Sequence, residues 1–481
     1  MDGQNIVEIS FLNLQNENPT FRIDSSFFDK KVLWSLSKIQ RCDHFYIKRE
    51  NVVNGPFGST ITTDSHLENG FIPLVRSINI NQGFYINDND LVYISEEDND
   101  TIKHSQLNTD DIVLSRVGSI GFFARVDAEM ETCNISSNNI GIKLSEYPQN
   151  LRHYILTFLN TQTAFGLTMR RASGNVQPKL TVDEICRIAI PSFSSVFYDK
   201  ISLLILKSEK HRCCARECDK AAHDLFSNAL DLDSVNPSKQ SIKIASIKDS
   251  FCISDRLDAE YYHPKYDTYF SILDRFETTR IPIEFDVFRN SGTNYAEGVS
   301  DVGVIKTKQL SNSGVNTEGV ESYFTNEVCA QNKSTFISKN DVIFASMGVG
   351  SLGKVSLFSY DGEERFVTDS TLRIYRAKKT ARVLPEVLCV FLQSTIGQEL
   401  IYRYVVGSTG IINIYDDDIA KIPIPVLNSK LQKDIAAKVQ ESFDLRRQSK
   451  QLLEYAKQAV EMAIEQGEDA ALAWLKDKVE Q

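Results

Sequence analysis

One glycine-rich stretch has the spacing of a dinucleotide-binding loop. Residues 348–353 (GVGSLG) fit the G-x-G-x-x-G pattern, in which glycines let the backbone approach a pyrophosphate at the N-terminus of the following helix. The next residues, 354–360 (KVSLFSY), alternate like a β-strand instead. The pattern therefore favours a tight turn between two strands, and a nucleotide-binding enzyme that uses this stretch is kept as a distant alternative.

A second group of residues has the side chains of a metal site. It consists of His211, Cys213, Cys214, Cys218 and His223. On a helix only Cys214 and Cys218, four residues apart, share a face. Zinc sites usually take their cysteines from turns, with a second pair of ligands elsewhere. We therefore predict ordinary helix residues here and no metal site.

Other catalytic signatures are absent from the sequence. It contains no Walker A motif, no G-x-S-x-G, no H-E-x-x-H, and no Asn-Pro-Pro-Tyr or Asp-Pro-Pro-Tyr tetrapeptide of the kind that adenine-N6 methyltransferases carry. We therefore predict a non-catalytic protein that holds no cofactor of its own.

The elements that would position any site occur twice, at an offset of about 230 residues. The Arg-x-Asp motif of Arg22 and Asp24 recurs at Arg256 and Asp258. Further matches follow in the same order: 111–114 with 341–344, 115–121 with 345–353, 158–160 with 391–393, and 188–191 with 422–425. Because chance would not keep these matches collinear, we predict two copies of one module.

Each copy combines strand-like and helical segments. Short runs rich in β-branched and aromatic residues predict strands at 74–80, 112–115 and 122–126 in copy one, and at 304–307, 342–345 and 354–358 in copy two. Helices are expected at 151–161 and 384–395. Each copy ends in Ile-Pro and is followed by a long helix with apolar residues at helical spacing, at about 195–230 and 428–467.

These elements predict an α+β fold. We expect two homologous mixed α/β domains, related by a pseudo-two-fold internal repeat and separated by two long helices that pair as an antiparallel coiled coil. The expected division is domain 1 at 1–194, spacer helix 1 at 195–232, a linker at 233–243, domain 2 at 244–426, and spacer helix 2 with a C-terminal tail at 427–481.

Composition indicates a soluble, cytoplasmic protein of several domains. The chain has 481 residues, of which 42% are hydrophobic and 24% charged, as in globular proteins. Its nine cysteines lack the spacing of a disulfide framework, which is typical of a reducing compartment. No apolar run approaches the roughly 18 residues that a membrane span needs, and the first ten residues do not resemble a secretory signal.

The net charge of −11 does not favour a surface that is basic throughout. Any surface that faces nucleic acid must therefore be local. Residues 147–182 contain no acid and include Arg152, Arg170, Arg171 and Lys179. The alternative is a solvated surface on which charges are unevenly spread.

Several of these stretches resemble a known family. Residues 54–59 (NGPFGS), 70–80 (GFIPLVRSINI), 111–121, 173–180 (SGNVQPKL) and 188–191 (IAIP) are similar to the first target-recognition domain in the specificity subunit of type I restriction–modification systems. Residues 256–262, 341–353 and 422–425 resemble the second such domain. The resemblance covers nearly the whole chain. Copy two departs from it at 407–414 (GSTGIINI), which lacks the glutamine that Gln177 supplies in copy one.

The resemblance implies a non-catalytic subunit that recognises double-stranded DNA. Each domain would read one half of a bipartite target. The helices would set the distance between the halves and dock two adenine-N6 DNA methyltransferase subunits, which recruit ATP-dependent restriction and translocase subunits. S-adenosylmethionine, ATP and Mg would bind to those partners. The nearer alternative is the same scaffold in another defence or modification assembly.

The candidate DNA contacts are basic and glycine-rich loop positions, because arginine can grip guanine and lysine can meet phosphate. In copy one they are Gly55, Phe57, Gly58, Ser59, Arg76, Arg116, Arg170, Arg171 and Lys179, and in copy two Lys306, Lys308, Arg403, Gly407 and Ser408.

Overall fold

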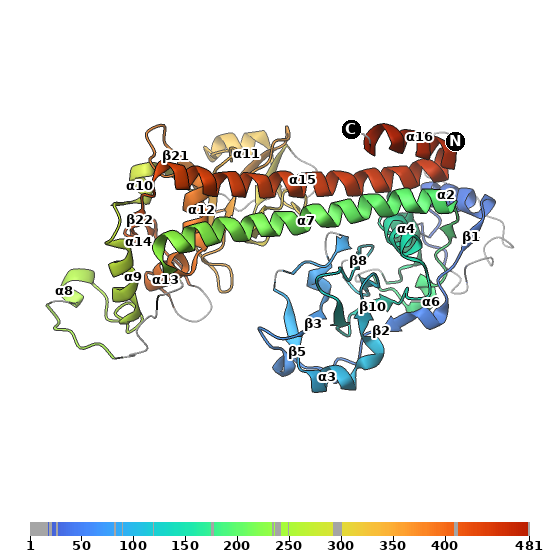
Figure 1. Ribbon diagram of the computed structural model, residues 1–481, viewed down its shortest axis with the longest axis horizontal. Coiled ribbons are helices and arrows are strands. Elements are labelled where there is room, and N and C mark those ends of the chain that lie inside the picture. Colours follow the sequence, from blue (N-terminus) through green and yellow to red (C-terminus); the bar gives the residue numbers. More distant parts are fainter. Residues whose placement is uncertain are drawn as a thin grey trace. The chain divides into compact units, whose positions relative to one another are not determined.

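The computed structural model divides into two compact units (Figure 1). Unit 1 is Met1–Lys210 with Gln448–Gln481, and unit 2 is His211–Arg447. The residues that the structure describes are 18, 22–25, 27–80, 83–88, 90–118, 120–174, 178–232, 235, 242–248, 250–291, 301–407 and 412–479. Each of the two long helices is divided between the two units. The boundaries of separate spacer helices expected from the sequence therefore remain a prediction.

Unit 1 is built on two sheets, with strand orders β2-β10-β7-β8-β4 and β5-β3-β9-β6. The strands are β2 (Val52–Asn54), β3 (Ile72–Val75), β4 (Phe84–Tyr85), β5 (Val92–Ile94), β6 (Leu107–Asn108), β7 (Ile112–Ser115), β8 (Phe123–Arg125), β9 (Thr132–Ile135) and β10 (Asn139–Ile142). The pairs β3/β9 and β4/β8 are parallel and the others antiparallel. Every residue of β7 and β10 is buried, as expected for central strands covered on both faces.

Helices and a small ribbon complete unit 1. They are α2 (Lys30–Arg41), α3 (Glu96–Thr101), α4 (Gln149–Leu159), α5 (Gln162–Arg171), α6 (Val182–Ile185) and α16 (Glu468–Val479), with β1 (His44–Phe45) paired to β11 (Ile190–Pro191). Thr161 caps α5 by accepting a hydrogen bond from the Ala164 amide. Helix α4 buries His153 and every residue from there to Leu159, so it forms part of the core.

Unit 2 repeats most of these elements in the same order. Its strands are β12 (Thr278–Thr279), β13 (Phe285–Phe288), β14 (Val302–Ile305), β15 (Leu310–Ser311), β16 (Gly314–Val315), β17 (Tyr323–Phe324), β18 (Val342–Ala345), β19 (Val355–Leu357), β20 (Arg365–Thr368), β21 (Leu372–Ala377) and β22 (Ile424–Pro425). Its helices include α8 (Phe251–Ser254), α9 (Lys265–Leu273), α10 (Ile281–Glu284), α11 (Asn326–Gln331), α12 (Pro385–Gln393), α13 (Thr395–Arg403) and α14 (Asp416–Ile419). The sheets are β13-β21-β18-β19, β17-β14-β20, β12-β22 and β15-β16.

The internal repeat predicted from the sequence is confirmed by strand pairing. In unit 1, β10 pairs antiparallel with both β2 and β7, and in unit 2, β21 pairs antiparallel with both β13 and β18. The parallel pair β3/β9 recurs as β14/β20. The Arg-x-Asp motif also recurs as an ion pair, with Arg22 Nε 2.7 Å from Asp24 and Arg256 Nε 2.7 Å from Asp258. Each unit therefore holds one copy of the module.

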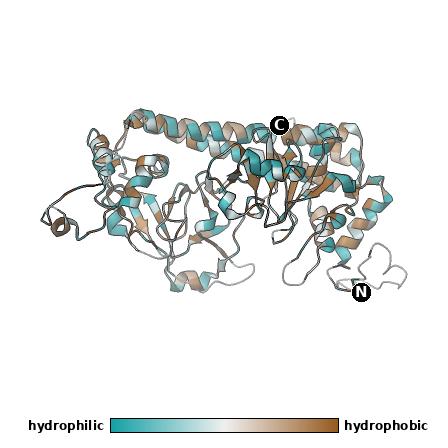
Figure 2. Cartoon of the chain, turned by 90° about the horizontal axis from the view of Figure 1, so that it is seen from below, coloured by the Kyte–Doolittle hydropathy of each residue, from teal (hydrophilic) through white to brown (hydrophobic). Residues whose placement is uncertain are grey.

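The two long helices, α7 (Ser195–Leu230) and α15 (Ser429–Gln466), pair antiparallel within both units. In unit 1 the hydroxyls of Ser208 and Ser449 lie 2.7 Å apart. In unit 2 Arg446 donates to Asp219 at 2.6 Å. Residue numbers thus fall along α15 as they rise along α7, as predicted. Hydrophilic and hydrophobic residues are interspersed along the long helix that is visible in Figure 2. Among the described residues no helix is long and apolar enough to cross a membrane.

The predicted strands at 74–80 and 304–307 were placed wrongly. Strand β3 ends at Val75 and β14 ends at Ile305, and each is followed by a single 3₁₀ turn. In copy one the Arg76 amide donates to the Asn79 side chain at 3.0 Å, and in copy two the Lys306 amide donates to Gln309 at the same distance. These side chains close the turn, which local β-propensity does not reveal.

Candidate nucleic-acid interface

In copy one, several loops meet at a polar turn between β9 and β10. This turn, residues 136–139 (SSNN), is named the hub turn. The Ser136 amide donates to Val75 O at 2.9 Å, which fixes the end of β3. The Asn138 carbonyl accepts the Arg116 amide at 2.7 Å, and the Asn139 carbonyl accepts the Gly55 amide at 3.0 Å. The hub turn therefore ties the loops after β2, β3 and β7 together by main-chain hydrogen bonds.

The glycine loop of residues 55–59 packs directly on the hub turn. A Cβ on Gly55 would overlap the Ser136 carbonyl, so only glycine fits. A Cβ on Gly58 would lie 3.6 Å from Ser137 Oγ, an ordinary contact. Phe57, Gly58 and Ser59 are exposed, so the loop presents one aromatic ring and a polar edge to solvent.

Three of the predicted basic residues flank the hub turn. Arg76 follows β3 directly, and its guanidinium donates to Asp90 O. Arg116 follows β7, and its carbonyl accepts the Leu180 amide at 3.0 Å. Lys179 is exposed and forms a β-bridge with Val117. The structure thus brings Arg76, Arg116 and Lys179 together with the glycine loop, although they come from separate parts of the sequence.

Copy two has the same turn with fewer positive charges around it. The Asp369 amide donates to Ile305 O at 3.0 Å, and the Ser346 amide donates to Thr371 O at 3.0 Å. Because its amide makes the hydrogen bond that the Arg116 amide makes in copy one, Ser346 is the equivalent of Arg116. Asn413 forms a β-bridge with Met347, as Lys179 does with Val117 in copy one, so Asn413 is the equivalent of Lys179. The second cluster therefore lacks two of the basic side chains of the first.

The predicted contacts of copy two fall partly around this second turn. Lys306 follows β14 as Arg76 follows β3. Lys308 is exposed and pairs with Glu321. Gly407 is exposed, with a φ of +112°, and Ser408 lies outside the described residues.

Arg170 and Arg171 are not the exposed basic pair that the sequence led us to expect. Their exposed fractions are 4% and 7%. Arg170 Nε donates to Phe27 O at 2.9 Å, and its guanidinium lies 4.1 Å from the centre of the Phe27 ring. Arg171 pairs with Glu184 at 3.6 Å. These internal partners count against direct contact with DNA, so we leave both out of the proposed interface.

Arg403 has the same internal role in copy two. Its guanidinium lies 4.6 Å from the centre of the Tyr261 ring, and that of Arg256 lies 4.7 Å from the same ring. In copy one, Arg22 and Arg170 both stack on Phe27. In each copy, one aromatic ring thus packs between two arginines. This contact joins the start of copy one to the end of α5, and the start of copy two to the end of α13. We therefore leave Arg403 out of the interface as well.

The glycine-rich residues 348–353 form the expected turn between antiparallel strands β18 and β19. Gly348, Gly350 and Gly353 have φ values of +106°, +72° and +88°, which side-chain-bearing residues rarely adopt. Strand β19 follows at once, so the helix N-terminus that a pyrophosphate requires is missing at this position. Within the described ranges no group of three His, Cys, Asp or Glu residues could hold a metal ion.

A buried polar network in unit 1 escaped the sequence analysis. His153 Nδ1 lies 2.8 Å from Ser202 Oγ of α7, and His153 Nε2 lies 3.1 Å from Asp110 Oδ1. Arg125 makes ion pairs of 2.5 Å with Asp110 and with Glu209 of α7. The order Ser-His-Asp matches a hydrolase triad, but all three side chains are buried. A substrate could not reach the hydroxyl, so the network serves to join the domain to α7.

The partners of Asp110 in this network lower its pKa. Burial by itself would raise the pKa of Asp110, but the hydrogen bond and charge of His153 and the charge of Arg125 outweigh it and lower the pKa to about 2. In copy two the equivalent positions hold Asn340 and Glu386. Gln440 of α15 donates to them at 3.3 and 2.7 Å. Polar side chains thus face the long helix in both copies.

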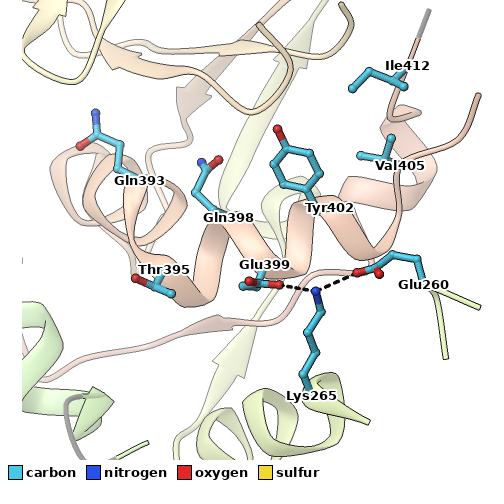
Figure 3. Close-up of a pocket in the computed structure, with 9 residues that line it drawn as sticks. All are labelled: Glu260, Lys265, Gln393, Thr395, Gln398, Glu399, Tyr402, Val405 and Ile412. Atoms are coloured by element: carbon cyan, nitrogen blue, oxygen red, sulfur yellow. Dashed lines mark ion pairs between the residues drawn. The ribbon is translucent and has the colours of Figure 1, made fainter. Parts of the chain in front are cut away.

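Unit 2 has a pocket of about 710 Å³ beside α13 (Figure 3). Lys265 lies between Glu260 and Glu399, at 2.8 and 2.9 Å. Burial would lower the pKa of Lys265, but the hydrogen bonds to the two glutamates outweigh it, so the pKa is raised and the side chain stays charged. One cation between two carboxylates leaves a net negative charge, which does not suit a nucleic acid.

Comparison with known proteins gives distant structural likenesses. No family model and no curated protein matches the chain. The S subunit of a type I restriction–modification system from M. genitalium is 11% identical, with 88% of this chain and 95% of that chain covered and a TM-score of 0.37. A chain from a study of type I R-M complex assembly (11% identical, 82% and 92% covered) and the HsdS subunit from Thermoanaerobacter tengcongensis (11%, 89% and 96%) have TM-scores of 0.28 and 0.26. Because these likenesses are distant, the function proposed below rests on the residues of the chain itself.

Proposed function

We propose that this chain is a DNA-recognition subunit that reads a bipartite double-stranded target, one half with each copy of the module. The observation that carries the proposal is the duplicated loop cluster. In copy one a turn between two strands ties the loops after β3 and β7 together by main-chain hydrogen bonds. In copy two the equivalent turn makes equivalent hydrogen bonds to the loops after β14 and β18. Two equivalent loop clusters on one chain suit a target with two half-sites.

The surface chemistry of copy one supports DNA as the ligand. Lys179 is exposed, and Arg76 and Arg116 are half-buried beside the hub turn. Arginine can bind guanine O6 and N7 together, and lysine meets phosphate oxygens. A local cluster of this kind allows binding despite the net charge of −11, because attraction to the backbone is screened beyond about 10 Å.

The long helices are proposed to set the half-site spacing and to dock partners. The resemblance found in the sequence supports two adenine-N6 methyltransferase subunits, with ATP-dependent restriction and translocase subunits added to them. S-adenosylmethionine, ATP and Mg would then bind on the partners, in keeping with the missing methyltransferase tetrapeptide.

Salt-dependent binding of the full-length chain to duplex DNA tests the proposal. The logarithm of the affinity should fall with the logarithm of salt, with a slope of about −0.9 for each phosphate neutralised. Lys179→Ala should reduce that slope by about 1 and weaken all sequences alike. Lys200→Ala on α7, also exposed, is the control and should change nothing. Binding that ignores both salt and Lys179 would contradict the proposal.

A further inference from the structure

Phe57 is the most unusual side chain of the proposed interface. It is 86% exposed, whereas a phenylalanine ring normally gains about 1.5–3 kcal/mol from burial. Single exposed apolar residues are common on protein surfaces, so exposure alone assigns no role. What distinguishes Phe57 is how firmly its loop is held and what surrounds it.

The loop that carries Phe57 is fixed on both sides of the ring. Before it, the Gly55 amide donates to Asn139 O at 3.0 Å, and the Gly55 Cα abuts the Ser136 carbonyl with no room for a Cβ. The Pro56 ring is buried. After it, the Thr60 amide donates to Phe57 O at 2.9 Å and closes a turn. The ring is therefore presented from a rigid support, which lowers the entropy cost of using it in binding.

The loops held next to the Phe57 loop carry arginines. The hub turn on which the loop packs also holds the loop of Arg116, through the 2.7 Å bond to Asn138 O. The Ser77 hydroxyl, next to Arg76, donates to the same carbonyl at 3.5 Å. The Phe57 loop is therefore held beside the loops that carry Arg76 and Arg116. Architectural DNA-binding proteins combine such parts: cationic side chains hold the phosphates while an apolar ring enters the base stack.

We propose that Phe57 inserts against the base stack of the half-site read by copy one and partly unstacks one base step there. This inference rests on the proposed function. Steps that unstack at little cost, such as pyrimidine–purine steps, would then be preferred at that position without any hydrogen bond to a base edge. Phe57 would be a specificity-determining residue that reads deformability.

The test uses the full-length chain and duplexes of its selected target with 2-aminopurine placed at successive positions of the copy-one half-site. Binding should raise the fluorescence at one position severalfold, and Phe57→Ala should abolish that rise and weaken binding about tenfold. Phe57→Trp should retain both. Phe71→Ala is the matched control: Phe71 is 93% exposed but precedes β3, at the end opposite Arg76, and should behave as the parent chain.

The outcomes separate this inference from the proposed function. Salt-dependent DNA binding with no fluorescence rise, and with Phe57→Ala equal to the parent, would overturn the role of Phe57 and leave DNA recognition standing. A loss of partner-subunit binding in Phe57→Ala, with DNA binding unchanged, would also overturn it and assign the ring to a protein contact. A chain that does not bind DNA at all would overturn both.

Discussion

Replacing Arg125 with leucine should destabilise unit 1 strongly. The Arg125 side chain is 2% exposed and pairs with Asp110, which is 4% exposed, and with Glu209, which is 18% exposed. Arg125→Leu would leave two carboxylates in this buried site without their cation. Breaking a buried ion pair in this way costs about 3–5 kcal/mol.

The internal repeat provides the compensating variant. Leu357 occupies the register position of Arg125, since it pairs with Val342 as Arg125 pairs with Ile112. A leucine side chain therefore fits the fold at this point. Adding Asp110→Asn and Glu209→Gln to Arg125→Leu removes the unpaired charges, and the triple variant should recover to within about 1–2 kcal/mol of the parent chain.

Tryptophan fluorescence during urea unfolding measures the effect. The chain has two tryptophans, Trp34 and Trp474, and both belong to unit 1, so the signal reports on this unit. The free energy of unfolding should fall by about 3–5 kcal/mol in Arg125→Leu and rise again in the triple variant. A single variant within about 1 kcal/mol of the parent, or a triple variant no better than the single one, would refute the reasoning.

Three further predictions follow from the same contacts. Gly55→Ala should weaken DNA binding at least tenfold because its Cβ would displace the glycine loop from Ser136, whereas Gly58→Ala, with room for a Cβ, should bind normally in a fluorescence anisotropy titration. The lowered pKa of Asp110 means that its roughly 2 kcal/mol of stabilisation is present above about pH 4 and lost as the pH falls towards 2; Asp110→Asn should remove this part of the pH dependence of unfolding. Arg170→Ala should lower the stability of unit 1 by about 2–3 kcal/mol and leave DNA affinity unchanged; a weaker affinity in an equally stable variant would restore Arg170 as a contact.

Much of the fold could be predicted because the sequence contains two copies of one module, and each copy supports the assignment of the other. Strands such as 112–115 and 342–345 are local runs of β-branched residues, and the Arg-x-Asp motif repeats visibly. The fate of Arg170 could not be predicted, because its partner Phe27 lies 143 residues away in the sequence. Residues 147–182 contain no acid and therefore suggest a basic surface, but Arg170 and Arg171 within them are buried.

The centre of the candidate site was also missed. Residues 136–139 are a short polar run that resembles any surface turn, and only their main-chain hydrogen bonds show that they gather the surrounding loops. The turn at the same place in copy two, residues 369–372 (DSTL), differs from it in sequence. Comparing the two copies would therefore not have identified the hub turn either.

Selection from a random pool of duplex DNA tests the central claim most directly. The full-length chain should enrich two short conserved half-sites separated by a fixed number of unspecified base pairs. Lys179→Ala should weaken binding without changing the enriched sequence. A single uninterrupted site, or no enrichment over input, would contradict the account.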